Sequence, residues 1–332
     1  MPLGVRTPRP RQLLMRARQG SHSRSMQREI SVAFDIIIMQ AFSGLSLFTI
    51  LLLMALGLAI VFGLMGVINM AHGELMALGA YVTYLVALFF ERYLPSLMGI
   101  YIFFAIFCAF AATFAFGYVL ERGFIRWFYN RPLDTLLATW GLSLVLQQFY
   151  RSTFGAQEVS VPLASWLSGA WEPVAGIQLP LNRMFIIGLT VLVALGVFFL
   201  LYKSRWGLRV RAVTQNRPIS AAVGINTDRV DALTFAVGSG LAGIAGSVFT
   251  MLGSTNPGTG QLYIVDSFIV VVFGGVQSLL GTVLSAFVIA ESQTALEYLS
   301  TGTIAKVTIL LCVIVMLYFR PQGLFASKVR GA

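Results

Sequence analysis

The sequence predicts an all-α, polytopic membrane protein with about eight to ten membrane-spanning helices, some of them broken. Composition is the first reason: the 332 residues are 57% hydrophobic and only 11% charged, with a mean hydropathy of +0.82. Soluble domains carry roughly 25% charged residues. The second reason is that the apolar residues form long runs, and at about 20 residues per span the chain holds eight to ten helices.

Residues 1–29 form a basic tail without a long apolar run. The tail contains seven arginines and no acid before Glu29. We expect it to be disordered, and two interpretations are open. Either the tail attracts anionic lipid headgroups, or translation starts at Met26 and the tail is not part of the protein. The arginines favour a cytoplasmic N-terminus, and the alternative is an external N-terminus, which applies if residues 57–70 do not cross the membrane.

The spans follow from the apolar runs in chain order. The first is expected over 36–56, and 57–70 continues it as a second short span or a broken half-helix. Further spans are expected over 73–90, 97–120, 133–150, 184–202, 233–252, 264–275, 279–290 and 304–319.

Loop charge predicts which connections face the cytoplasm. Five cations and no acid lie between Lys203 and Arg217, which places this loop inside. The loop 152–182 carries acids and tryptophans and is expected outside. Arg320 places the C-terminus inside, so four crossings are expected between the two inner segments.

Three polar residues interrupt the apolar sequence near the end of the first span. Asn69, His72 and Glu74 lie within six residues and are flanked by Gly66 and Gly73. Polar groups in hydrocarbon must face protein, a partner or water, and a broken helix is tolerated where it is buried or lines a cavity. We hypothesise that these side chains shape a polar translocation path. The alternative is an internal hydrogen-bond network that fixes helix packing.

Thr139, Gln147 and Asp266 are further candidates for the same path. Hydroxyl and amide groups suit a neutral, hydrogen-bonding solute such as urea, whereas the alternative is hydrogen bonding between helices. Asp266 is a functional candidate as an acid in an apolar stretch. Its alternative role is to cap the helix that follows the Gly-rich turn 253–261.

The stretch from Gly66 to Tyr81 also carries a resemblance. It reads Gly-Val-Ile-Asn-Met-Ala-His-Gly-Glu-Leu-Met-Ala-Leu-Gly-Ala-Tyr and resembles the signature of permease subunits of branched-chain amino acid ABC importers. Three later stretches, Leu133–Gln148, Asn256–Gln261 and Arg320–Phe325, make it similar to the urea permeases of the UrtB type within that family. The similarity extends from Phe34 to Lys328.

The resemblance implies a domain organisation and a set of partners. It implies a permease domain over 30–325 in a bacterial inner membrane, with a cytoplasmic coupling loop at 203–231 and a cytoplasmic tail at 326–332. The implied partners are a second homologous permease, two cytoplasmic ABC ATPases, a periplasmic substrate-binding protein and membrane lipid. The implied substrate is urea or a short-chain amide. The alternatives are branched-chain amino acids, which are zwitterions and need groups for a carboxylate and an ammonium, or passive flow through a urea or amide channel.

The middle of the loop 203–231 resembles the ATPase-coupling region of such permeases. A coupling region needs a short helix that projects into a groove on the ATPase. Pro218 can begin that helix, with Asn216 as its candidate cap, and small residues permit close docking. The candidate coupling residues are Arg211, Pro218, Ala221, Ala222 and Gly224. The alternative is an ordinary basic loop.

Several function classes have no support in the sequence. None of the three lysines follows glycine, so the chain has no P-loop and is not expected to be an ATPase or another enzyme. The two histidines and two cysteines are dispersed, so no metal or other cofactor is expected. The remaining basic residues lie in short loops, which argues against nucleic-acid binding.

Overall fold

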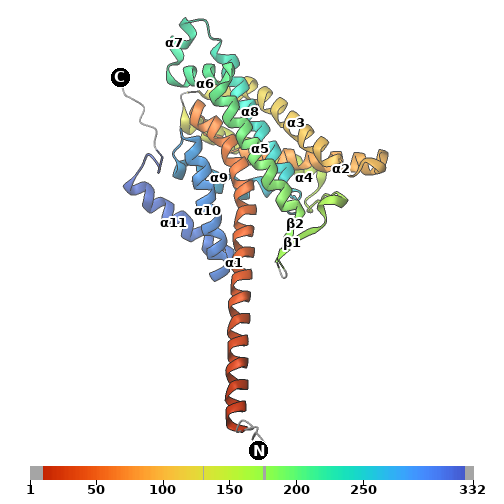
Figure 1. Ribbon diagram of the computed structural model, residues 1–332. Helices are drawn as coiled ribbons and strands as arrows, with labels where there is room; N and C mark the ends of the chain where they lie inside the picture. Colours follow the sequence, from red (N-terminus) through yellow and green to blue (C-terminus); the bar gives the residue numbers. More distant parts are fainter. Residues whose placement is uncertain (1–9, 130, 175–176, 326–332) are drawn as a thin grey trace, which may run out of the picture.

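A computed structural model of the chain describes residues 10–129, 131–174 and 177–325 and is helical almost throughout (Figure 1). Its α-helices are α1 (Pro10–Met65), α2 (His72–Tyr93), α3 (Tyr101–Gly123), α4 (Pro132–Phe154), α5 (Leu181–Lys203), α6 (Arg205–Gln215), α7 (Arg217–Ala222), α8 (Thr227–Phe249), α9 (Thr259–Gly274), α10 (Leu279–Leu299) and α11 (Gly302–Phe319). The short 3-10 helices are η1 (Pro95–Leu97), η2 (Ile125–Phe128) and η3 (Ser165–Leu167). The strands β1 (Ala170–Val174) and β2 (Ile177–Pro180) form an antiparallel pair in the loop before α5.

The predicted class, an all-α polytopic membrane protein, is confirmed. Seven helices in the described part of the chain are long and apolar enough to cross a membrane: residues 36–65 of α1, then α2, α3, α5, α8, α10 and α11. This strict count is below the expected number for two reasons. Helix α9 has only 16 residues, and α4 intersperses Thr, Ser and Gln among its apolar residues.

Helix α1 differs from the prediction at its N-terminal end. The described backbone of residues 10–29 is helical rather than disordered. Pro10 occupies the first helical position, where proline is tolerated, and the Arg, Leu, Met, Gln and Ala residues that follow favour helix. Helix α1 projects far beyond the bundle, and the N-terminus lies at the end opposite to α6 and α7 (Figure 1). Residues 1–9 and the tail 326–332 lie outside the described residues.

Helix α8 is the centre of the bundle and packs against α1, α2 and α3. In the apolar stretch of α8 that is long enough to cross a membrane, 78% of the residues are buried. Glycines permit this close packing. A Cβ at Gly246 would lie 1.9 Å from the carbonyl oxygen of Met76 on α2, and one at Gly243 would meet Thr113 on α3.

Two interruptions break the helices at one end of the bundle. Residues 66–71 separate α1 from α2, and residues 275–278 separate α9 from α10. Gly66 and Gly275 adopt φ of +69° and +98°, which glycine permits without a Cβ clash. The expected break at 57–70 is thus shorter, because α1 continues unbroken to Met65. The end of α1 contacts the second interruption, since a Cβ at Gly63 would lie 2.2 Å from the Val276 carbonyl oxygen.

The same end of the bundle holds the coupling loop and the C-terminal segment (Figure 1). Thr214 of α6 donates to the carbonyl of Leu64 at 2.8 Å, near the end of α1. The Leu324 amide donates to the carbonyl of Phe273 at 2.9 Å, near the end of α9. The four helices α8 to α11 therefore lie along the chain between the coupling loop and the C-terminal segment, and three of them, α8, α10 and α11, are long and apolar enough to cross a membrane.

Candidate functional site

The break at 66–71 places the three predicted polar residues in the protein interior. Asn69, His72 and Glu74 are fully buried. The Asn69 carbonyl oxygen Oδ1 accepts from the Ala71 amide at 3.0 Å and so forms a turn before α2. His72 Nε2 donates toward the carbonyl of Met54 at 3.3 Å.

Each of these three side chains also keeps one polar atom without a hydrogen-bond partner among the described residues: Asn69 Nδ2, His72 Nδ1 and Glu74 Oε2. More than nine in ten buried polar groups are hydrogen-bonded to protein or ordered water. Three such atoms within six residues make this the densest group of unpaired buried polar atoms in the described part of the chain.

Helix α4 supplies the partners of Glu74. Its carboxylate oxygen Oε1 accepts from Ser143 Oγ at 3.1 Å and from Gln147 Nε2 at 2.9 Å. Tyr150 OH donates to the Glu74 main-chain carbonyl at 2.9 Å, and Gln147 Nε2 lies 3.3 Å from Gln261 Oε1 on α9. Ser143, Tyr150 and Gln261 were not among the residues predicted for the path. The i, i+4, i+7 spacing of Ser143, Gln147 and Tyr150 on one helix face is the signal that could have found two of them.

Thr139 lies on α4 one turn before Ser143 and contacts the break itself. Its hydroxyl accepts from the Met70 amide at 3.0 Å and donates to the Thr135 carbonyl at 2.8 Å. The structure therefore brings Asn69, His72, Glu74, Thr139 and Gln147 together around the break. We call these five residues the break cluster.

Asp266 lies elsewhere. It sits inside α9, seven residues after the helix begins at Thr259, so it is not a helix cap. Gln261 and Asp266 are five residues apart, which places them about 140° apart around α9. Asp266 instead forms an ion pair with Lys306 of α11 at 2.8 Å.

This ion pair lines a cavity of about 360 Å³ that contains two cations and two acids. Arg183 Nη1 donates to Ser43 Oγ at 3.2 Å, and Gln293 Nε2 donates to Glu297 Oε1 at 3.0 Å. Leu47, Ile50 and Leu252 form its apolar part. We call it the charged cavity. Its lining residues come from the start of α5, the end of α10, the start of α11, the residues just after α8 and neighbouring parts of α1 and α9. They lie on the side of the bundle opposite to the coupling loop.

The coupling loop folds into the two short helices α6 and α7. Asn216 caps α7 by accepting from the Ile219 amide at 3.1 Å, and Pro218 lies in its first turn, as the sequence predicted. Gly224, with φ of +87°, lies just after the helix. Ala221, Ala222 and Gly224 are exposed. The apolar Ile219 and Val223 are 62% and 71% exposed on the same short helix and its end.

Arg211 is used within the chain. Its guanidinium donates to the Leu201 carbonyl at the end of α5 and lies over the ring of Tyr202 at 5.4 Å. These contacts hold α6 to α5, so the side chain of Arg211 is not free on the surface of the loop.

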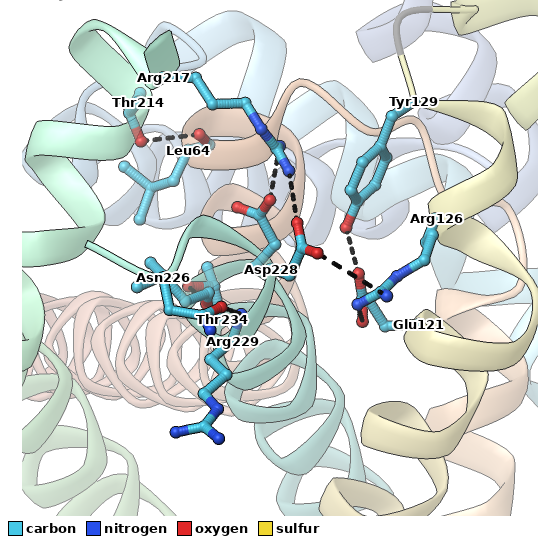
Figure 2. A network of polar contacts seen from close by, with 12 residues as sticks. Leu64, Glu121, Arg126, Tyr129, Thr214, Arg217, Asn226, Asp228, Arg229 and Thr234 are labelled. Atoms are coloured by element: carbon cyan, nitrogen blue, oxygen red, sulfur yellow. Dashed lines mark hydrogen bonds and ion pairs between the residues drawn. The ribbon is translucent and has the colours of Figure 1, made fainter. Parts of the chain in front are cut away.

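Figure 2 shows a network of charged side chains beneath the coupling helix. Arg217 at the start of α7 contacts Asp231 Oδ2 at 2.5 Å and Asp228 Oδ1 at 3.2 Å, both on α8. Arg126 lies between Asp228 at 3.9 Å and Glu121 at 3.7 Å. This network ties α7 and α8 to the connection between α3 and α4.

Tyr129 completes the network. Its hydroxyl donates to Glu121 Oε1 at 2.7 Å. Burial, followed by the hydrogen bond to the Glu121 carboxylate, raises the pKa of Tyr129 well above its ordinary value. The phenol therefore remains a hydrogen-bond donor across the physiological pH range.

The loops on the opposite side of the bundle contact one another. Val159 and Thr255 form a backbone bridge, and Glu158 accepts from Asn256 Nδ2 at 3.3 Å and from the Ser254 hydroxyl. These two hydrogen bonds lower the pKa of Glu158 below its ordinary value. Trp166 and Trp171 are exposed in the loop 152–182, on the side where the charge pattern predicted an external loop.

Comparison with known proteins identifies the family. Residues 40–318 match the family model described as "Branched-chain amino acid transport system / permease component". The chain belongs to this family. The permease LivH of Escherichia coli K12, named for high-affinity branched-chain amino acid transport, is 30% identical over 303 residues, which cover 89% of this chain and 97% of that protein. The permease BraD of Pseudomonas aeruginosa, with the same transport named, is 29% identical over 298 residues, or 86% and 94% of the two chains.

A weaker match extends to sugar permeases of the same kind. The xylose permease XylH of Escherichia coli K12 is 29% identical over 122 residues, or 35% of this chain. No solved structure matches the chain.

Membership in this permease family settles the general role. The chain is a permease subunit of an ABC transporter, is not an enzyme, and is a multi-pass protein of the inner membrane. The relatives reported above do not support the urea branch indicated by the sequence motifs.

Proposed function

We propose that this chain forms the translocation path of an ABC importer for branched-chain amino acids. The similarity to LivH and BraD over almost their whole length is the observation that carries this proposal. It replaces urea as the first candidate substrate.

The charged cavity supports a zwitterionic substrate. A branched-chain amino acid offers a carboxylate, an ammonium group and an aliphatic side chain. Arg183 and Lys306 suit the carboxylate, and Asp266 and Glu297 suit the ammonium group. The apolar part of the cavity suits the aliphatic side chain, and a volume of about 360 Å³ falls in the range of about 300–1,000 Å³ that is usual for small-molecule pockets.

The break cluster is the proposed inner part of the path. Interrupted membrane helices occur where backbone lines a cavity, and paired interruptions mark substrate sites in many transporters. The unpaired atoms offer one donor, Asn69 Nδ2, and two acceptors, Glu74 Oε2 and the His72 Nδ1 of a ring that already donates through Nε2.

The proposed partners follow from the two ends of the bundle. Two ATPases dock on the coupling loop, where α7 exposes small and apolar side chains. A substrate-binding protein docks on the loops opposite, near Trp166 and Trp171. A second, homologous permease completes the membrane part of the importer.

Urea or a short-chain amide is the second candidate substrate, favoured by the groups around Glu74. Ser143, Gln147 and Gln261 offer hydroxyl and amide groups to a neutral solute that is rich in N–H donors. The resemblance of three sequence stretches to urea permeases points the same way.

Uptake of labelled leucine and of labelled urea distinguishes the candidates. The assay uses cells that lack their own carriers for both solutes and express this chain with its partner subunits. We expect ATP-dependent leucine uptake that isoleucine and valine inhibit and urea does not. Urea uptake that leucine leaves unchanged would reject the first substrate in favour of the second. Equal solute flow through liposomes that contain this chain alone would reject the importer and indicate a passive channel.

A further inference from the structure

We propose that Arg217 is the positioning residue that transmits movement of the coupling helix α7 to the broken segment 66–71. This inference rests on the proposed function in one respect, because it requires an ATPase that docks on α7. It adds a connection, through named residues, from the proposed docking site on α7 to residues 66–71 of the proposed translocation path.

Arg217 connects α7 to α8 through ion pairs. The helix has only six residues and packs against α6 and α8. The Arg217 side chain is 43% exposed, whereas its partner Asp231, at 2.5 Å, is 7% exposed. If Arg217 moves away, Asp231 loses its closest cation while it remains nearly buried, which is costly. The position of α7 is therefore coupled energetically to α8.

The same guanidinium contacts the connection between α3 and α4. It lies over the ring of Tyr129 at 5.4 Å, a cation–π geometry. The Tyr129 hydroxyl and Arg126 both bind Glu121 at the end of α3. Figure 2 shows Arg217 and Arg126 both reaching toward Asp228, and Tyr129 pointing toward Glu121.

A cavity of about 250 Å³ separates Arg217 from the break. Arg217, Asp231 and Tyr129 lie on one part of its wall, and Gly66 and Thr135 on another. The cavity gives these groups room to change position without displacing the packed core around α8.

Hydrogen bonds carry the connection beyond the cavity. The Thr135 hydroxyl donates to the Phe128 carbonyl, beside Tyr129, at 2.9 Å. One turn further along α4, the Thr139 hydroxyl accepts from the Met70 amide in the break at 3.0 Å. A contiguous route thus runs from α7 through Tyr129 and α4 to the break cluster. When ATP drives a shift of α7 that withdraws Arg217, the contacts that hold residues 66–71 in place change.

The test measures ATP hydrolysis and solute transport together in the purified importer, reconstituted in liposomes with its ATPases and binding protein. The variant is Arg217→Ala. The matched control is Arg229→Ala, because Arg229 is an exposed arginine in the first turn of α8 with no acidic partner in the part of the chain that the structure describes. Arg217→Lys is the conservative variant, which keeps the charge and loses the planar fork.

We expect R217A to retain bound ATPases and to hydrolyse ATP, while the number of solute molecules transported per ATP falls at least about fivefold, as for a typical coupling between sites. R217K should fall between R217A and the unmodified protein, and R229A should equal the unmodified protein.

Three results would overturn the inference. R217A that transports as many molecules per ATP as the unmodified importer shows that Arg217 transmits nothing. R217A that fails to bind the ATPases makes Arg217 a docking residue. An equal loss in R229A makes the effect one of general surface charge. If R217A does not accumulate, Thr139→Val tests the far end of the same route, and normal transport per ATP in that variant also overturns the inference. Failure of the proposed function is a different result, in which the unmodified importer shows no ATP-driven uptake at all.

Discussion

Replacement of Gly246 by alanine should destabilise the bundle strongly. The new Cβ would lie 1.9 Å from the carbonyl oxygen of Met76, where a close C···O contact is about 3.3 Å. Helices α2 and α8 would have to separate by about 1.4 Å at this point. Packed interiors do not separate by that much without a cost in free energy. We therefore expect the free energy of unfolding to fall by about 1–3 kcal/mol, the usual range for an overpacked core.

Gly188→Ala on α5 is the matched control. Gly188 also lies in a membrane-length helix, but a Cβ there would meet nothing within 4 Å. Alanine favours helix over glycine by up to about 1 kcal/mol, so this variant should be neutral or slightly more stable. The assay is denaturant-induced unfolding of the purified permease in detergent, followed by tryptophan fluorescence. Unfolding of G246A and G188A at the same denaturant concentration would show that close packing of α2 against α8 does not require glycine at position 246.

Three other predictions concern the polar sites. Glu74→Ala removes the acceptor of two donors on α4, so we expect the free energy of unfolding to fall by about 1–3 kcal/mol and uptake to be lost. Uptake at the normal rate would show that Glu74 is not part of the translocation path. Lys306→Ala leaves Asp266 without its ion-pair partner and removes one of the two cations proposed to bind the substrate carboxylate. The KM for leucine should therefore rise about tenfold, which corresponds to about 1.4 kcal/mol. An unchanged KM would show that the charged cavity does not bind the substrate. Hydrogen bonds from the Ser254 hydroxyl and then from Asn256 lower the pKa of Glu158. The stability that these bonds contribute is therefore present above the ordinary pKa of 4.5 and is lost as the pH falls through the lowered pKa. Limited proteolysis of these loops should therefore increase in acid, and Glu158→Gln should abolish the change; identical pH profiles would contradict this.

The sequence predicts the membrane class, the positions of most spans and the break, because each depends on local composition. A run of apolar residues defines a span wherever its partners lie. The polar interruption at Asn69, His72 and Glu74 is equally local, and so are the cap at Asn216 and the start of α7 at Pro218.

Contacts between distant segments were not predictable in the same way. The pairing of Glu74 with Ser143, and of Asp266 with Lys306, depends on how α4, α9 and α11 are arranged, which no local pattern records. Asp266 was grouped with the break cluster because both interrupt apolar sequence, but the helix rotation between Gln261 and Asp266 points them to different neighbours. The helical start of α1 shows the reverse case, in which local propensity outweighed a composition typical of disorder.

The contact between Gly63 and the Val276 carbonyl joins the end of α1 to the segment between α9 and α10. If the end of α1 shifts toward this segment, the backbone at Gly63 presses on it. The first and last thirds of the polypeptide are therefore in direct backbone contact at this point. A bulkier residue at position 63 would push the end of α1 and the segment 275–278 apart.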